Sequence, residues 1–477
     1  MQKNRSLYNG LFYIPLLTAL LLCGCRKLIQ VTPPITQLVS ANVYDNNASA
    51  SAVLTGIYDN MSGGGMATGQ SSINLEVGLL SDELVNYFTG SPVLPQFYSN
   101  ALTSTPNAYF WPEIYKELYV ANSALDNLPP STGVTVEEKN QLIGEAEFMR
   151  AFLNFYAVAL YGDVPLVTTT NYKLNNTINR SPAAEVYQQI IADLKDAESL
   201  LPANYLTPTG SVTGERVRPN KGAAAALLAR AYLYNKDWPD AESQADSVIA
   251  NTAEYGLVKN PDSVFLKNST EAIWQLQPVQ PGYNTFEGYY FVLTATAPGV
   301  NSYNPVAMSS FLVNAFDSGD LRRTDWVGEV TIGGQKYYYP YKYKVNTVNT
   351  SNPVTEYAMV LRLAEVYLIR AEARAEQNNI GGAQADLNAI RNRAGLGSTT
   401  AATTGDLLTA VLHERQVELF TEWGHRWFDL IRMGQADAVM SVVTPQKQGT
   451  WSDNKELLPI PASEILINPN LTQNPGY

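Results

Sequence analysis

The 477-residue sequence predicts a mainly α-helical protein. Long segments without proline recur along it and are rich in Ala, Leu, Glu and Arg, a composition that favours helix. The segments 221–250 and 361–393 each contain two amphipathic helices joined by a short turn. Because one such hairpin cannot bury its apolar face alone, several must stack into a helical superstructure. Between 252 and 353 this pattern gives way to loops dense in Tyr, Gly, Pro and Asn.

The chain begins with the pattern of an export signal. Lys3 and Arg5 precede the apolar run 11–22, which is shorter than the ~20 residues of a membrane-spanning helix. The run ends in Leu-Cys-Gly-Cys, a lipobox-like site, so we predict cleavage before Cys25 and lipidation of its thiol. An ordinary secreted protein with a free cysteine is the alternative, and Cys23 is the competing acceptor.

The composition of the remaining chain excludes several classes of function. Without the leader, 30 basic side chains face 44 acidic ones, so the formal charge changes from −12 to −14 and argues against nucleic acid as a partner. No cysteine follows Cys25, which excludes disulfides and thiolate nucleophiles. His413 and His425 are twelve apart on one predicted helix, not the four apart of a helical zinc pair. We therefore predict no metal and no cofactor.

The organisation that we expect follows these changes in composition. It is a lipoprotein signal peptide at 1–24, a lipidated tether at 25–44, an N-terminal helical part at 45–251, a loop-rich ligand-binding subdomain at 252–353, and a C-terminal helical hairpin with a closing segment at 354–477.

Apolar stripes at helical spacing predict the helices of the N-terminal part. Gly162 is a typical helix stop, and Trp111 lies on an apolar stripe, so we expect it to be buried rather than to serve as a sugar platform. The hairpin at 221–250 resembles a tetratricopeptide repeat. The expected helices cover 40–58, 111–125, 145–161, 182–200 and the two arms of 221–250.

The loop-rich subdomain is expected to contain a few short strands, at 272–277 and around 337–343. Asp317 and Asp320 superficially suggest calcium, but the further ligands of an EF-hand loop do not follow them.

In the C-terminal part we expect the hairpin 361–393 and then one long helix over 405–433. Three glutamates spaced four apart on that helix have the composition of a hydrolytic centre, but Glu422 is expected to pair with Arg426 one turn away. Ion-paired carboxylates have lowered pKa values and make poor general acids. No nucleophile-elbow, zinc-protease or phosphate-loop motif occurs, so we predict no catalytic residue. The glutamates are Glu414, Glu418 and Glu422.

Several of these segments together resemble one protein family. The C-terminal half contains LRLAEVYLIRAEA, ADLNAIRNRAGL, ERQVELFTEWGHRWFDLIR and the closing LLPIP and NPGY, and the N-terminal half contains KLIQVTPP and AEFMRAFLNFYAVALYGDVPLV. In this order they are similar to the SusD/RagB family of outer-membrane nutrient-binding lipoproteins.

The resemblance implies a binding protein rather than an enzyme. Family members capture an oligosaccharide at the cell surface and pass it to a SusC-like TonB-dependent outer-membrane transporter. The expected location is therefore the outer membrane, with a lipid anchor on Cys25, although Arg26 and Lys27 differ from the acidic residues that often follow in surface-exposed relatives and leave the leaflet open. A peptide ligand, as for RagB-like relatives, and an extracellular glycoside hydrolase are the alternatives.

We expect the ligand on the aromatic loops. Sugar rings have apolar C–H faces that lie flat on aromatic rings, and amide groups nearby supply hydrogen bonds. The alternative is that these aromatics are strand residues facing a core. The predicted ligand-binding residues are Tyr283, Asn284, Tyr289 and Tyr303, joined by Tyr98 from an earlier loop, as in corresponding regions of the family; Phe286, Tyr290 and Asn301 lie in the same segment, 281–303.

The lipobox-like site generates a direct prediction. The native protein carries palmitate on Cys25 and partitions with membranes, because acyl chains contribute ~0.8 kcal/mol per buried CH₂. Cys25→Ala is released or left unprocessed, as membrane fractionation and palmitate labelling would show. Unchanged membrane partitioning of this variant would contradict the prediction.

Overall fold

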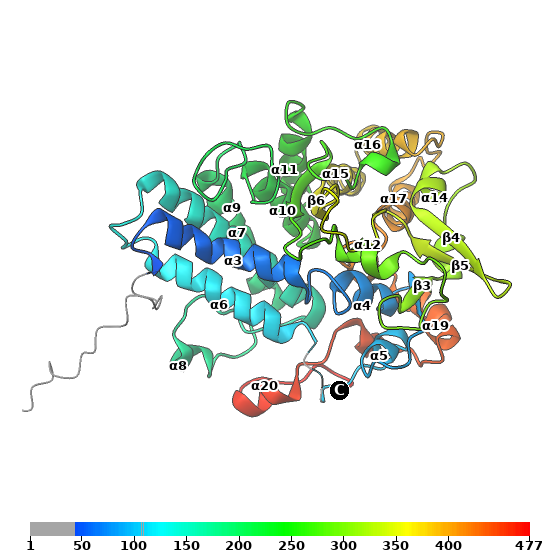
Figure 1. The fold of residues 1–477 in the computed structure, drawn as a ribbon, viewed down its shortest axis with the longest axis horizontal. Helices are drawn as coiled ribbons and strands as arrows, with labels where there is room; N and C mark the ends of the chain where they lie inside the picture. The colour runs from blue at the N-terminus through cyan, green and yellow to red at the C-terminus, as the bar shows by residue number, and fades with distance from the viewer. Residues whose placement is uncertain (1–42, 106, 108) are drawn as a thin grey trace, which may run out of the picture. The chain divides into compact units, whose positions relative to one another are not determined.

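The helices of the described chain pack against one another largely in chain order (Figure 1). The computed structural model describes residues 43–105, 107 and 109–477, so the predicted signal peptide, Cys25 and most of the tether lie outside the described residues. Residues 44–477 form one compact unit. Within the described part, no helix combines the length and the apolar character needed to cross a membrane.

The long helices confirm the predicted superstructure. α7 packs on α6 and α9, α10 on α9 and α11, and α15 on α11, α16 and α17, so each hairpin buries the face of the next. The helices are α3 (Asn47–Gly63), α4 (Ile73–Leu80), α5 (Leu94–Tyr98), α6 (Trp111–Asn127), α7 (Val136–Tyr161), α8 (Tyr172–Asn175), α9 (Ala183–Leu200), α10 (Lys221–Tyr234), α11 (Trp238–Ala250), α12 (Phe286–Phe291), α13 (Ser310–Val313), α14 (Leu321–Asp325), α15 (Leu363–Glu376), α16 (Ile380–Arg393), α17 (Thr404–Glu418), α18 (His425–Arg432), α19 (Ala436–Gln446) and α20 (Ala462–Ile467).

Capping side chains decide where two helices depart from their expected bounds. The side chain of Asn46 accepts a hydrogen bond from the Ser49 amide at 3.0 Å, so α3 begins at Asn47, and residues 40–42 of the expected helix lie outside the described residues. The Thr135 hydroxyl accepts from the Glu138 amide, which starts α7 nine residues before the expected position. Gly162, with φ of 72°, ends α7 as predicted.

Of the three strand pairs in the described chain, β1–β3 and β2–β6 connect the loop-rich segment to the helical parts, and β4–β5 is a hairpin within it. In the pair β2–β6, Ala272 lies opposite Arg362 and Leu276 opposite Ala358. The strand predicted at 272–277 is therefore confirmed, whereas the one predicted at 337–343 lies slightly earlier. The pairs are β1 (Leu84–Asn86) with β3 (Val306–Met308), β2 (Ala272–Leu276) with β6 (Ala358–Arg362), and β4 (Val327–Ile332) with β5 (Gln335–Pro340).

Aromatic side chains fill the core between these strands and the N-terminal helices. Trp274 of β2 is fully buried, and its ring lies 5.1 Å from that of Phe148 and 5.3 Å from that of Phe152. Its indole nitrogen donates to the Val217 carbonyl at 3.3 Å. Trp111 is also buried, 5.0 Å from the Tyr161 ring, as its position on an apolar stripe predicts. The core thus joins the loop-rich segment to the helices.

The prediction of one helix over 405–433 is wrong. The chain leaves the helical path at 419–424, between α17 and α18. Thr421 and Trp423 have positive φ angles of 52° and 46°, which are rarely adopted by side chains of this size. His413 and His425 consequently lie on two different helices.

Buried partners hold this break in place. The Thr421 amide donates to Glu83 at 3.2 Å, and the Trp423 amide donates to the Asn74 side-chain oxygen at 2.6 Å. The indole of Trp423 donates to the Met359 carbonyl at 2.8 Å. These hydrogen bonds to other elements replace the helical bonds that local composition favours.

The expected pair of Glu422 with Arg426 is also wrong, because the break separates them. Glu422 contacts Arg362 at 2.7 Å, whereas Arg426 pairs with Asp82 at 2.7 Å.

Candidate ligand-binding site

The aromatic segment contains a short helix, α12, where the sequence predicts only loop. Thr285 begins it, because its hydroxyl accepts from the Gly288 amide at 3.0 Å. Gly288 faces the Val345 carbonyl so closely that a Cβ would lie 2.4 Å from the oxygen. Only glycine allows this approach, so Gly288 lets α12 pack directly against the backbone at Val345.

Aromatic rings gather around α12. The ring of Tyr289 lies 5.1 Å from that of Tyr283 and 5.5 Å from that of Tyr303, and Phe286 lies 6.1 Å from Tyr290. All five are partly exposed, and Tyr303 is 53% exposed. They form neither strand nor closed core, and their rings pack edge-to-face or tilted against one another. We call Tyr283, Phe286, Tyr289, Tyr290 and Tyr303 the aromatic cluster.

The other two predicted site residues have different surroundings. The side-chain oxygen of Asn284 accepts from the backbone amides of Thr355 and Glu356, at 2.7 Å and 3.0 Å, so it fastens the segment to the residues that precede β6. Tyr98 lies at the end of α5, with Lys447 5.6 Å from its ring centroid. The structure thus brings together Tyr283, Tyr289 and Tyr303, and it does not place Tyr98 among the rings of the aromatic cluster.

Hydrogen bonds of asparagine side chains hold the 292–304 loop against the end of α12. The amide nitrogen of Asn304 donates to the carbonyls of Tyr290 and Val292, both at 3.2 Å, which satisfies the end of the helix. Asn301 closes the turn by accepting from the Tyr303 amide at 2.9 Å. Tyr303 is therefore positioned against Tyr289 by hydrogen bonds within the loop.

A buried polar chain connects α12 to the break between α17 and α18. Glu287 accepts from the side chain of Asn74 at 2.9 Å, and Asn74 in turn accepts from the Trp423 amide at 2.6 Å. Burial raises the pKa of Glu287 to about 7. The helix α12, which carries Phe286, Tyr289 and Tyr290 of the aromatic cluster, is thus connected by buried hydrogen bonds to the C-terminal part of the chain.

A cleft of about 440 Å³ opens beside this site, at the end of α3 and the start of α6. Val279 and Gln280 line it, and they also line a small pocket under Tyr283 and Phe286. Sequence reasoning missed the cleft, because its acidic residues stand on the polar faces of amphipathic helices. The run Gly63–Gly65, which lines the cleft at the end of α3, is the local feature that the sequence offers there.

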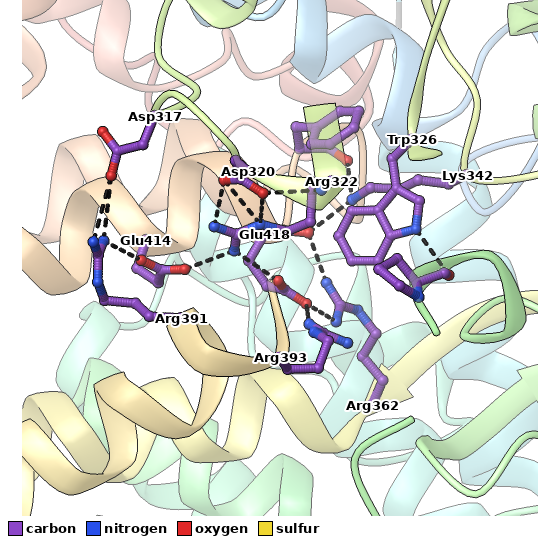
Figure 2. A network of polar contacts seen from close by, with 12 residues as sticks. Asp317, Asp320, Arg322, Trp326, Lys342, Arg362, Arg391, Arg393, Glu414 and Glu418 are labelled. Carbon is purple, nitrogen blue, oxygen red and sulfur yellow. Dashed lines mark hydrogen bonds and ion pairs between the residues drawn. The ribbon is translucent and has the colours of Figure 1, made fainter. Parts of the chain in front are cut away.

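The three glutamates considered for hydrolysis are paired with basic side chains, and Figure 2 shows two of them, Glu414 and Glu418. Arg322 pairs with Glu414 at 2.6 Å and with Glu418 at 2.9 Å, and Arg393 also contacts Glu418. Burial alone would raise the pKa of Glu418, but the charges of Arg393, Arg362 and Arg322 outweigh it and hold that pKa well below its ordinary value. A carboxylate that stays ionised and hydrogen-bonded in this way does not act as a general acid.

The two aspartates considered for calcium are occupied in the same network. Asp320 pairs with Arg322 at 2.7 Å, and Asp317 with Arg391 at 3.4 Å. Across 43–105, 107 and 109–477, no three His, Cys, Asp or Glu side chains are grouped so that they hold a metal ion.

Comparison with known families gives two matches. A model described as the SusD family matches residues 321–477, and a model described as starch-binding associating with outer membrane matches residues 35–233. SusD-like protein P2 of Formosa agariphila is 28% identical and aligns over 98% of this chain and 99% of its own length. SusD-like protein P25 of the same organism is 25% identical over 77% of this chain and 79% of its own.

Solved structures agree with these matches. A SusD superfamily protein from Bacteroides vulgatus superposes with a TM-score of 0.77 at 22% identity, covering 91% of this chain and 99% of that one. A laminarin-binding SusD-like protein superposes with a TM-score of 0.74 at 25% identity, covering 91% of this chain and 100% of that one. The mainly helical fold is the same in both.

The Glu418 network generates a pH-dependent prediction. Glu418→Gln removes a charge that three buried arginines share, so the free energy of unfolding at neutral pH should fall by about 3–5 kcal/mol. Because the folded pKa is lowered, the stabilisation is complete above the unfolded pKa of roughly 4.3 and is lost as the pH falls through the folded value. The difference in melting temperature between wild type and variant should therefore be largest near neutral pH and shrink below about pH 4.

Glu185→Gln, on the exposed face of α9, serves as the matched control and should change little at any pH. A difference for Glu418→Gln that is the same at all pH values would show that the charge of Glu418 is not what the arginines require.

Proposed function

The chain belongs to the SusD family, and from that premise we propose that it is an outer-membrane lipoprotein that binds oligosaccharides and delivers them to a SusC-like TonB-dependent transporter. The observation that carries the proposal is the aromatic cluster around α12. Similarity to a laminarin-binding SusD-like protein across nearly the whole chain supports a glycan as the ligand.

The geometry of the cluster suits sugars. Tyr283, Tyr289 and Tyr303 meet at angles near perpendicular, 67° for the first pair and 70° for the second, so their faces line a shallow corner rather than a flat wall. A pyranose ring laid against one face meets the edge of the next ring and has phenolic hydroxyls within reach of its own. Because α12 is fixed at both ends, binding costs little ordering of the protein.

Binding without turnover is part of the proposal. Glu414 and Glu418 form ion pairs with Arg322, and Glu422 forms ion pairs with Lys342 and Arg362. The purified protein should leave bound oligosaccharides intact. Release of product from a bound glycan, lost on mutating one Asp or Glu, would instead support the glycoside hydrolase alternative.

The test of the binding site is a triple variant, Tyr283→Ala, Tyr289→Ala and Tyr303→Ala. Each stacking ring contributes on the order of 1 kcal/mol, roughly fivefold in affinity, so the triple variant should bind about a hundredfold more weakly. A glycan array with the purified full-length protein in detergent identifies the ligand, and calorimetry then measures the affinity.

The control is Tyr119→Ala with Tyr172→Ala, which removes two exposed rings, 55% and 66% exposed, outside the cluster. This variant should bind as wild type does. Undiminished affinity of a triple variant with an unchanged melting temperature would place the ligand elsewhere. Binding to a peptide library and to no glycan would support the RagB-like alternative.

A further inference from the structure

The cleft beside the aromatic cluster has an acidic lining that the proposed function does not use. It lies where α3 ends and α6 begins, two elements that are neighbours in Figure 1. Asp59, Glu113 and Glu117 contribute three carboxylates, and Lys116 is the one basic side chain of the lining. Its volume of about 440 Å³ falls in the range of ~300–1,000 Å³ that is typical of sites for small organic ligands.

Glu117 is the buried member of this lining. Its side chain is only 8% exposed, and its Oε1 accepts from the Asn60 amide at 3.1 Å. Its Oε2 is buried and has no hydrogen-bond partner. Leaving a buried carboxylate oxygen without a donor costs free energy, and a ligand that brings an N–H donor recovers it.

An ammonium group already stands at the mouth of the cleft. Lys116 Nζ lies 3.1 Å from Glu117 Oε1, and the lysine side chain is 64% exposed. The ammonium of Lys116 stays largely in contact with solvent, so it remains hydrated when an incoming cation takes its place beside Glu117. The contact shows that the Glu117 carboxylate binds an ammonium group. Lys116 occupies this position until a ligand amine displaces it.

Glu113 lies one turn before Glu117 on the same face of α6 and is held by the loop that follows α3. The Met66 amide donates to its Oε2 at 2.5 Å, and a Cβ on Gly65 would lie 2.2 Å from the same oxygen. Glycine at 65, with φ of 71°, is therefore what lets the loop close on the carboxylate. The acidic wall is preorganised rather than a set of freely moving surface charges.

We propose that the cleft binds the protonated primary amine of an amino sugar, within an oligosaccharide whose neighbouring rings lie on the aromatic cluster. This inference rests on the proposed function and specifies its ligand class. An ammonium carries three donors and one positive charge, which matches Glu117 Oε2 and the carboxylates around it. Val279 and Gln280, shared by both pockets, connect the cleft to Tyr283 and Phe286, so one chain of sugars spans the two.

The experiment compares two probes that differ only in the amine. Calorimetry of the full-length protein in detergent at about pH 6, where primary amines are protonated, measures the affinity for a glucosamine hexamer and for an N-acetylglucosamine hexamer. We expect the amine form to bind about tenfold more tightly at low salt, and the advantage to decrease as salt is added.

Substituting the two partners of the Lys116–Glu117 ion pair should change the affinity advantage of the amine hexamer in opposite directions. Glu117→Gln abolishes the tenfold advantage, whereas Lys116→Gln increases it because the competing ammonium is gone. Glu185→Gln on α9 is the control and leaves both affinities unchanged. A purely structural role of Glu117 does not predict the gain in Lys116→Gln.

Several outcomes overturn the inference. Equal affinity for the two hexamers overturns it while leaving the proposed function intact, if other glycans bind at the aromatic cluster. Binding of Ca²⁺ that depends on Glu117 with no preference for the amine, or binding of lysine-containing peptides and of neither hexamer, also overturns it. Failure of every glycan in the array to bind contradicts the proposed function itself.

Discussion

The arrangement of the C-terminal half depends on the buried guanidinium of Arg362. It pairs with Glu271, Glu418 and Glu422, at 3.0, 2.6 and 2.7 Å, and so ties the end of β6 to the start of β2, the end of α17 and the break that follows. Burying these charges is costly, and the cost is offset only because nearly every carboxylate oxygen finds a donor. Such a network therefore specifies one arrangement of these segments more than it adds stability.

That arrangement reaches the proposed ligand site through a short series of contacts. The break at 419–424 points Trp423 toward Asn74 and Met359, and Asn74 holds Glu287 beneath the aromatic cluster. Lys342 supports the same break through the carbonyls of Glu418 and Phe420, at 2.8 Å each, and burial lowers its pKa to about 8. The C-terminal segment that the SusD family model matches is thus hydrogen-bonded, through Asn74, to the helix that carries much of the aromatic cluster.

The sequence predicts the long helices well, because their apolar stripes and caps are local signals. It does not predict the break, since 405–433 is helix-favouring throughout and only distant partners such as Glu83 and Arg362 terminate α17. For the candidate site, the density of tyrosines points to 281–303, where the rings of Tyr283, Tyr289 and Tyr303 do meet, and the binding role of this segment stays a prediction. Asn284 is used to fasten the backbone and Tyr98 lies apart, because the direction of a side chain on a loop is set by its neighbours in space. Nothing in the sequence marks Glu117 as a binding residue, because a glutamate on a helix normally faces solvent.

We propose that one aromatic cluster, held by the buried arginine network, binds the ligand. A crystal structure of the protein with an oligosaccharide chosen from a glycan array tests it most directly. We predict sugar rings in van der Waals contact with Tyr283, Tyr289 and Tyr303, while α12 and the break at 419–424 keep their positions. Sugar density on another face of the protein, with the aromatic cluster left empty, would contradict the claim.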